Sequence, residues 1–252
     1  MTTSWLRTEV TLAPGGRGSD LEMADRLGIG VATAIDPTQW QLIRTVDRIE
    51  LRTPTSCGRL ALEVSLRSGP LVQRLRSARK TDALPRACGI GRQGGPPLRM
   101  VDATAGLGRD AMVMASLGCE VIAIERLPAL VFLLADAVAE SSLARSITVI
   151  AADATTWLTA QGPDRRPQVI YLDPMFGSVG KAQVKKDMQI CRLLAGAPDD
   201  PAPLLAAARA TATERVVVKR HHGEAAIATD VSFAVAGERV RFDVYLTPAA
   251  PR

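Results

Sequence analysis

The sequence predicts an α/β fold, a Rossmann-like, doubly wound sheet of about seven mostly parallel strands with a small β-containing N-terminal lobe. Three observations support it. Strand and helix patterns alternate from Leu98 onward, a glycine-rich turn follows the first strand of that series, and an Asp-Pro turn follows the fourth. With 252 residues, 47% of them hydrophobic, the chain can bury a substantial core.

Short apolar runs predict the strands of the large sheet, and the longer apolar periodicities between them predict helices. The strands are expected at 98–102, 120–124, 147–151, 168–172, 215–219, 232–235 and 242–246. The helices are expected at 110–117, 128–141, 155–161, 183–194 and 203–211. Crossovers between parallel strands are right-handed by default, so the order predicts a doubly wound sheet.

The first part of the chain has a different pattern, with frequent Gly and Pro and short alternating stretches at 49–52 and 60–66. Residues 69–88 form an arginine-rich helix or loop, and Gly94 to Pro97 interrupts regular structure. We therefore expect a small N-terminal lobe over residues 1–95, basic toward its end, and a larger domain over 96–252.

The formal charge is only +5, but it is unevenly distributed. A basic surface is what a polyanionic partner requires, because phosphate neutralisation dominates nucleic-acid affinity. An ordinary solvated helix face is the alternative interpretation. The segment 59–92 contains only two acidic residues, Glu63 and Asp82. Its eight basic residues are Arg59, Arg67, Arg74, Arg76, Arg79, Lys80, Arg86 and Arg92.

Composition also argues against a membrane or metal-dependent protein. No apolar run reaches the roughly 18 residues of a membrane span, and the first residues lack an apolar signal region. The four cysteines are far apart, with no paired spacing typical of zinc. We expect a cytoplasmic protein with reduced thiols and no metal; the sequence leaves the oligomeric state open.

The loop from Asp102 to Asp110 has the strand, glycine turn and helix context of an adenosine-cofactor site. Gly106 and Gly108 remove side chains where a cofactor approaches the backbone, and Asp110 complements the dipole of the next helix. Glu125, at the end of the following strand, can accept both ribose hydroxyls. The pattern fits a nicotinamide dinucleotide and S-adenosylmethionine almost equally.

Asp153 closes the third predicted strand of the large sheet. From there its carboxylate could accept a hydrogen bond from an adenine amino group. It is also well placed to be the N-cap of the helix expected to begin near Thr155. The two roles are compatible.

The loop Asp173-Pro174-Met175-Phe176 favours methyl transfer to a planar amine. The lone pair of an aromatic amine is delocalised into the ring, so an enzyme must hold the amine with acceptors. The carboxylate of Asp173 and the carbonyl of Pro174 supply two acceptors, and the proline restrains their relative direction. Phe176 can stack on an extruded base. We predict that these three residues are catalytic.

Basic residues lie near the same predicted edge and could steer phosphates toward Phe176. His221 and His222 are assigned no catalytic role, because no third histidine exists to complete a metal site. Besides these two histidines, the residues that could steer phosphates are Lys181, Lys185, Lys186, Lys219 and Arg220.

Over residues 101–246 the chain resembles the RsmJ family of bacterial 16S ribosomal RNA guanine-N2 methyltransferases. The segments that carry the resemblance are 101–110, 124–126, 166–176, 184–188, 215–220 and 241–245. It implies a class I methyltransferase fold, S-adenosylmethionine as cofactor, and 16S rRNA or the small ribosomal subunit as partner. It also implies donor contacts at Arg109, Asp110, Glu125, Arg126, Asp153, Ala154 and Asp173, in addition to the loop residues Asp102, Gly106 and Gly108.

The leading hypothesis is methyl transfer from S-adenosylmethionine to the exocyclic N2 of a guanosine in 16S rRNA. Three alternatives remain open at this point. The same amine chemistry could act on adenine N6 in DNA or RNA, the glycine loop alone permits a nicotinamide oxidoreductase, and a non-catalytic RNA-binding protein could retain a vestigial pocket.

Overall fold

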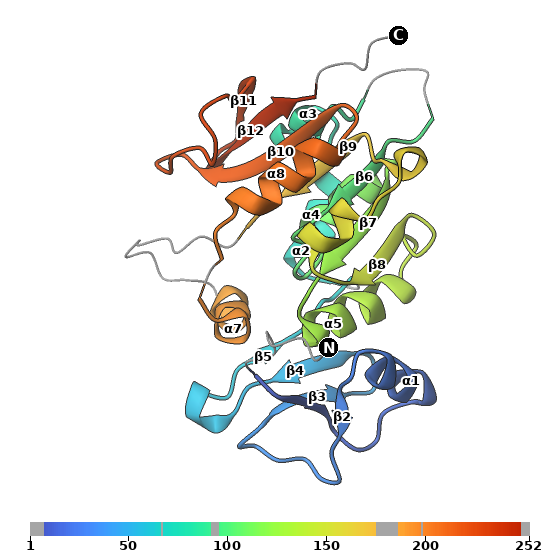
Figure 1. Ribbon diagram of the computed structural model, residues 1–252. Coiled ribbons are helices and arrows are strands. Elements are labelled where there is room, and N and C mark those ends of the chain that lie inside the picture. The colour runs from blue at the N-terminus through green and yellow to red at the C-terminus, as the bar shows by residue number, and fades with distance from the viewer. Residues whose placement is uncertain (1–7, 67, 92–95, 175–185, 198, 248–252) are drawn as a thin grey trace.

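The computed structural model describes residues 8–66, 68–91, 96–174, 186–197 and 199–247 of the chain. Two sheets dominate it, a small five-stranded one near the N-terminus and a large seven-stranded one above it in Figure 1. The predicted α/β architecture, with a seven-stranded sheet and a small N-terminal β lobe, is therefore confirmed.

The large sheet has the strand order β11-β12-β10-β9-β6-β7-β8. From β10 to β8 all neighbours are parallel, whereas β12 is antiparallel to both β10 and β11. All seven strands coincide with the apolar runs that predicted them. Their bounds are β6 Arg99–Asp102, β7 Glu120–Glu125, β8 Ile147–Ala151, β9 Val169–Leu172, β10 Arg215–His221, β11 Phe233–Ala236 and β12 Val240–Leu246.

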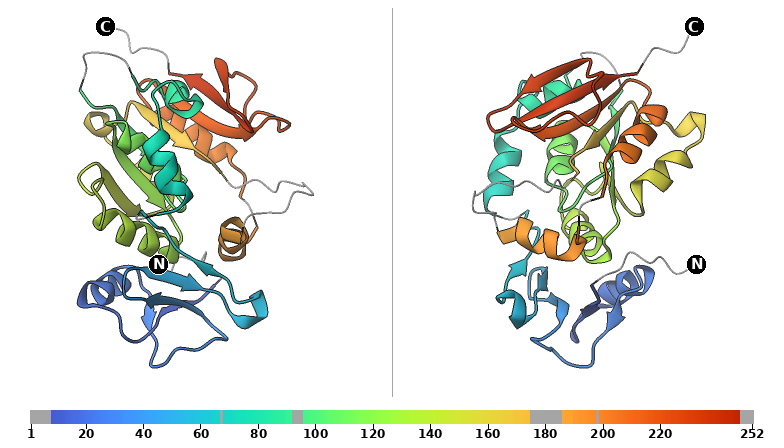
Figure 2. Two further views of the ribbon diagram at one scale, coloured as in Figure 1. Left: turned by 180° about the vertical axis from the view of Figure 1, so that it is seen from behind. Right: turned by 60° about the vertical axis from the view of Figure 1, so that its left-hand side comes forward.

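Helices cover both faces of the large sheet. Helices α2, α3, α4 and part of α5 share a buried cluster on one face, and α6 and α8 pack on the other. Figure 2, left, shows α2 and α3 on the side opposite to α8. The bounds are α2 Pro70–Ser77, α3 Ala83–Cys88, α4 Arg109–Ser116, α5 Pro128–Ala139, α6 Ala154–Thr159, α7 Lys186–Ala195 and α8 Ala202–Thr211, with the short 3-10 helix η2 at Pro163–Arg165.

Strand β9 explains why the centre of the sheet is apolar on both sides. All four of its residues are buried. Val169 and Tyr171 face the cluster beneath α3 and α4, while Ile170 and Leu172 face α6 and α8. A parallel strand covered on both faces has a continuous apolar sequence instead of an alternating one, as seen here.

The small sheet has the order β2-β1-β3-β4-β5. Strand β1 is parallel to β2 and β3, and the remaining pairs are antiparallel. The elements of this lobe are β1 Val10–Leu12, α1 Gly18–Arg26, β2 Gly30–Val31, β3 Trp40–Arg44, β4 Ile49–Arg52, η1 Thr55–Cys57 and β5 Ala61–Leu62.

The second alternating stretch of the N-terminal part forms a shorter strand than expected. A strand pattern spans 60–66, but only Ala61–Leu62 pairs with β4. Val64 and Leu66 instead pack against the apolar cluster of the large sheet. The chain therefore stops pairing with β4 after Leu62, because the next apolar side chains are buried against the large sheet.

Helices α2 and α3 precede the domain boundary expected near residue 95, and both contact the larger domain. Helix α2 packs on α4, and α3 contacts β10, β11 and β12. The arginine-rich segment 69–88 is therefore helical, and its helices lie on the large sheet.

The two sheets are joined through α5. Leu42 and Leu51 of the small sheet share one buried cluster with Leu130 and Leu133 of α5. Ile190 of α7 belongs to the same cluster, and Figure 1 shows α7 beside α5 between the two sheets. Burial of each such leucine stabilises the junction by about 1.5–3 kcal/mol.

A buried ion pair crosses the same junction. The guanidinium of Arg44, on β3, donates hydrogen bonds to Asp20 of α1 at 2.9 Å and to Asp136 of α5 at 3.3 Å. The side chains of Arg44 and Asp20 are only 5% and 4% exposed. Burial alone would raise the pKa of Asp20, but the hydrogen bonds from Arg44 and from the backbone amide of Arg17 lower it.

The described residues contain neither a membrane-spanning helix nor a disulfide. In that part of the chain no helix is long and apolar enough to cross a membrane. The four cysteines are free thiols, and three of them, Cys88, Cys119 and Cys191, are buried.

We predict that Arg44→Met destabilises the fold by about 3–5 kcal/mol, because it leaves the buried carboxylate of Asp20 without its cation. Urea unfolding at pH 7 measures this. The difference from the wild type should shrink as the pH falls, since protonation of Asp20 removes the uncompensated charge. Arg48→Met is the matched control: the Arg48–Glu63 pair is exposed and should cost less than about 1 kcal/mol. Equal losses in the two variants would contradict the prediction.

Candidate active site

The two loops singled out in the sequence meet at one edge of the large sheet. Strands β6 and β9 are parallel neighbours, with Asp102 opposite Tyr171, so both end on the same side. The backbone N–H of Asp173 donates a hydrogen bond of 2.6 Å to Oγ1 of Thr104. The glycine loop and the Asp-Pro turn are thus in direct contact.

Both glycines of the first loop adopt backbone conformations that favour glycine. Gly106 has φ +52° and Gly108 φ +70°. At Gly106 the nearest atom to an added Cβ would be the carbonyl oxygen of Thr104 at 4.0 Å, so the space beside the loop is open. At Gly108 a Cβ would lie 2.3 Å from Cδ1 of Leu134, a fully buried residue of α5. Gly106 thus borders open space, and Gly108 allows α5 to pack closely.

Glu125 ends β7 beside the glycine loop. Its Oε2 accepts the backbone N–H of Gly106 at 2.9 Å, and its Oε1 accepts that of Leu127 at 2.8 Å. Burial raises the pKa of Glu125, although these backbone hydrogen bonds oppose the rise. A carboxylate has about four lone-pair positions, so one that accepts two amides can still accept ribose hydroxyls.

Asp110, in the first turn of α4, is a buried hub. One of its oxygens binds Arg74 of α2 at 2.5 Å, and the other accepts the Tyr171 hydroxyl at 2.6 Å and Lys219 Nζ at 3.0 Å. Burial alone would raise the pKa of Asp110, but the charges of Lys219 and Arg74 and the hydroxyl of Tyr171 lower it. Asp110 is therefore an ionised carboxylate inside the protein.

Asp173 is joined to this hub through Lys219, whose Nζ lies 2.8 Å from Oδ2 of Asp173. Loss of hydration raises the pKa of Asp173, Lys219 opposes the rise, and Asp110 adds to it. The Asp173 side chain is 40% exposed, whereas that of Asp110 is 9% exposed. Of the two carboxylates that Lys219 binds, Asp173 is the one within reach of a substrate.

Asp102 lies beneath the loop instead of lining an open surface. It is 1% exposed, and its Oδ1 accepts the backbone N–H of Thr104 at 3.1 Å. Burial, together with the nearby charge of Asp110, raises the pKa of Asp102 well above its usual range. In this structure Asp102 holds the shape of the loop.

Three further residues that were predicted to contact the methyl donor take part in ion pairs or cap a helix. Arg109 pairs with Asp187 of α7, and Arg126 pairs with Asp199. Asp153 is the N-cap of α6, with Oδ1 accepting the Thr156 N–H at 2.8 Å, as one of its two interpretations anticipated. Ala154 is the buried first residue of that helix.

Pro174 follows Asp173 and is half-buried. Phe176, predicted to stack on the base, lies outside the described residues, as do Met175, Lys181 and Lys185. His222, just beyond the C-terminal end of β10, contacts the carbonyl of Gly237 at 3.1 Å. Within the described residues no group of three or more His, Cys, Asp or Glu side chains is arranged to hold a metal ion.

Sequence reasoning did not identify the groups that organise the site. Lys219 was interpreted as a phosphate-steering residue, yet its amine lies between two carboxylates. Tyr171, inside an apolar strand, and Arg74, in the basic segment, both bind Asp110. A lone lysine after three valines in a central strand was the available signal for Lys219, because such a residue needs a buried partner.

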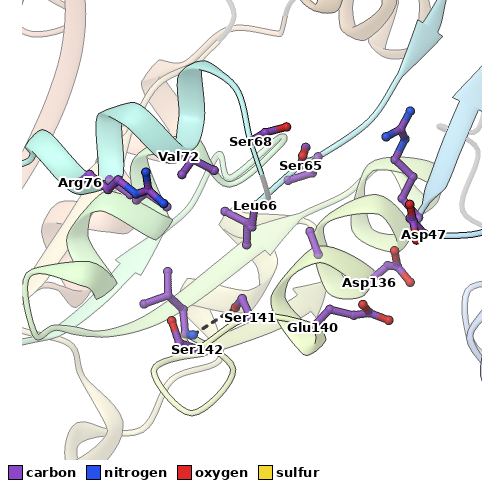
Figure 3. A pocket seen from close by; sticks show the side chains of 15 residues that line it. Asp47, Ser65, Leu66, Ser68, Val72, Arg76, Asp136, Glu140, Ser141 and Ser142 are labelled. Atoms are coloured by element: carbon purple, nitrogen blue, oxygen red, sulfur yellow. Dashed lines mark hydrogen bonds between the residues drawn. The ribbon is translucent and has the colours of Figure 1, made fainter.

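A cavity of about 540 Å³ lies elsewhere, between α2, α5 and the segment that joins the two sheets. Figure 3 shows Asp136 of α5 beside Glu140, the C-cap residue of that helix, with Arg76 across from them. Asp136 is paired with Arg44, and Glu140 with Arg17. None of the loop residues described above lines this cavity.

Comparison with known proteins identifies the class. A family model described as "Putative SAM-dependent methyltransferase" matches residues 22–247. The crystal structure of a SAM-dependent methyltransferase from Neisseria gonorrhoeae superposes with a TM-score of 0.74, covering 96% of this chain and 97% of its own, at 27% identity. Fold and family together define a SAM-dependent methyltransferase, which decides between the two cofactors that the glycine loop allowed.

The particular family follows from two curated relatives, each called ribosomal RNA small subunit methyltransferase J. The protein from Alkalilimnicola ehrlichii is 45% identical over 210 residues, 78% of each chain. That from Yersinia pestis is 39% identical over 240 residues, 91% of each chain. This chain belongs to the ribosomal RNA small subunit methyltransferase J family, as its sequence resemblance implied.

The residues at the sheet edge fit S-adenosylmethionine. Gly106 leaves open space that a Cβ would begin to fill, and Glu125 lies across from it with its carboxylate fixed by two amides. When bound, this cofactor supplies an electrophilic methyl group. The chain's own contribution is to hold the adenosine and to direct an acceptor toward that methyl group.

We predict that Gly108→Ala destabilises the protein by about 2–4 kcal/mol, because the new methyl group clashes with Leu134 and the backbone is left-handed. Gly106→Ala shares the backbone strain but not the clash, and should lose only about 1 kcal/mol. Urea unfolding of both variants makes the comparison. The packing argument fails if the two variants are equally stable.

Proposed function

We propose that this chain transfers a methyl group from S-adenosylmethionine to the exocyclic N2 of a guanosine in 16S ribosomal RNA. The observation that carries the proposal is the contact between the glycine loop and the Asp-Pro turn through Thr104 and Asp173. It brings a donor loop and a pair of amine acceptors to one edge of the sheet. The name shared by the two relatives supplies the RNA class.

The proposed roles follow the geometry of this edge. Glu125 accepts the ribose hydroxyls, Gly106 and Gly108 admit the donor, and Asp153 accepts the adenine amine while it caps α6. Asp173 and the carbonyl of Pro174 hold the two N–H groups of the target amine. Phe176 stacks on the extruded base. Arg109, Asp110, Arg126, Ala154 and Asp102 shape and charge the donor pocket.

Catalysis of this kind depends on positioning and electrostatics, without a covalent enzyme intermediate. An acceptor on each N–H draws the amine hydrogens out of the ring plane, which localises the nitrogen lone pair toward the methyl group. As the new N–C bond forms, the nitrogen loses a proton to Asp173 or to water. Asp173 must therefore be ionised when the substrate binds.

We further propose that the substrate is ribosomal RNA in the cytoplasm. We assign the grip on rRNA, as naked RNA or as the assembled small subunit, to residues 1–95, and above all to the basic segment at their end. Arg76, Arg79, Lys80 and Arg86 of that segment are exposed, on and around α2 and α3, whereas the guanidinium of Arg74 binds Asp110. Phosphate contacts at these residues would position the nucleic acid without reading its sequence.

Adenine N6 is the second candidate acceptor, because acceptor geometry at an amine does not choose the base. Incubation of the protein with labelled S-adenosylmethionine and 16S rRNA from cells lacking the enzyme, followed by nucleoside mass spectrometry, separates the two. N2-methylguanosine supports the proposal, and N6-methyladenosine or unlabelled RNA refutes it.

We predict that Asp173→Ala lowers the rate of RNA methylation at least about 10³-fold, since it removes both the acceptor and the proton-accepting group. The affinity for S-adenosylhomocysteine, measured by calorimetry, should stay within several-fold. The matched control is Asp164→Ala, an exposed aspartate of η2 with no part in the site. A wild-type rate in Asp173→Ala would rule out the proposed mechanism.

A further inference from the structure

The ammonium group of Lys219 lies between two buried or half-buried carboxylates at the sheet edge. Its Nζ is 2.8 Å from Oδ2 of Asp173 and 3.0 Å from Oδ2 of Asp110. Its side chain is 25% exposed, so much of its stem lies in the protein. The side chain of Lys219 thus extends from β10 to bind both carboxylates.

We propose that Lys219 is a positioning residue for methyl transfer: its ammonium group fixes the carboxylate of Asp173 in the ionised form and in the orientation that receives the substrate amine. This inference rests on the proposed function of Asp173. It adds a residue that acts through Asp173 and touches neither substrate nor donor.

The first argument is geometric. Asp173 is held at its backbone by Thr104 Oγ1 and at its carboxylate by Lys219. With Oδ2 fixed by the ammonium group, the plane of the carboxylate and hence the direction of Oδ1 are set before the substrate arrives. Preorganisation of this kind avoids reorganisation during the reaction.

The second argument is electrostatic. Among the described residues, the titratable groups that face Asp173 are Lys219 and His221 from β10, Asp110 from α4, Asp102 from β6 and Tyr171 from β9. Among them Lys219 is the opposing charge within hydrogen-bond distance, while Asp110 is a like charge. Lys219 itself stays protonated, because Asp110 and Asp173 raise its pKa although burial would lower it.

The third argument concerns the proton. In the proposed reaction the amine nitrogen bonds to the methyl carbon, the carbon–sulfur bond breaks with its electron pair left on sulfur, and the nitrogen releases a proton. A protonated Lys219 cannot accept that proton, whereas the carboxylate of Asp173 can. Lys219 therefore keeps the acceptor available without competing for the proton.

The test is the titration of Asp173 in the protein without substrate or cofactor, followed by carboxyl 13C NMR and assigned by difference from Asp173→Asn. In Lys219→Met the pKa of Asp173 should rise, because the opposing charge is gone. In Asp110→Asn the pKa of Asp173 should fall, because a nearby negative charge is removed and Asp173 becomes the sole carboxylate partner of Lys219 among the two that it binds in the wild type. Opposite shifts distinguish this arrangement from general damage, which would move both variants the same way.

Activity provides a second readout. Lys219→Met should lower kcat at pH 7 by about 10- to 100-fold, recover toward the wild-type value as the pH rises above the new pKa of Asp173, and leave S-adenosylhomocysteine affinity within several-fold. Lys219→Arg should retain most of the rate. Arg145→Met removes an exposed positive charge away from the site and should behave as the wild type.

An unchanged Asp173 titration in Lys219→Met, or a rate loss that is the same at every pH, would overturn the role of Lys219. Failure of the proposed function gives a different result, because the titration needs no substrate. If the wild type methylates adenine instead of guanine N2, the opposite pKa shifts would still establish how Lys219 holds Asp173.

Discussion

The contact between the Thr104 hydroxyl and the Asp173 amide is the constraint on which the site depends. It exists because β6 and β9 are parallel neighbours in register, so the turns that follow them emerge together. Without this pairing, a glycine loop and an Asp-Pro turn are two common features of a sheet edge. With it, the space over Gly106 and the carboxylate of Asp173 belong to one site.

The electrostatics beneath that contact are unusual for a protein interior. Asp110 raises the pKa of both Asp102 and Asp173, and Asp173 adds to the rise at Asp102; Lys219 and Arg74 balance the negative charge. Removing one partner of a buried ion pair lowers protein stability by more than the intact pair adds, because the other charge is left unpaired in a medium of low polarity. The arrangement is therefore better explained by chemistry at the edge than by stability.

The sequence was sufficient for the large sheet but not for the internal contacts of the site. Apolar runs such as 169–172 identify buried parallel strands regardless of their partners, and all seven were correctly located. The pairing of Lys219 with Asp110 and Asp173 joins residues 109 and 46 positions apart, and no local pattern encodes it. Strands β1 to β3 were also missed: β1 and β2 have only three and two residues, and β1 pairs in parallel with both β2 and β3, a long-range pairing that no local turn pattern marks.

The junction at α5 has a mechanical consequence. That helix begins three residues after Glu125. It is bound to the small sheet by the shared leucine cluster along its first half and by the hydrogen bonds of Arg44 to Asp136 nearer its C-terminal end. The small sheet cannot swing away from the carboxylate of Glu125 without exposing this apolar cluster to water. A macromolecule that touched both regions would therefore contact two surfaces held at a fixed separation.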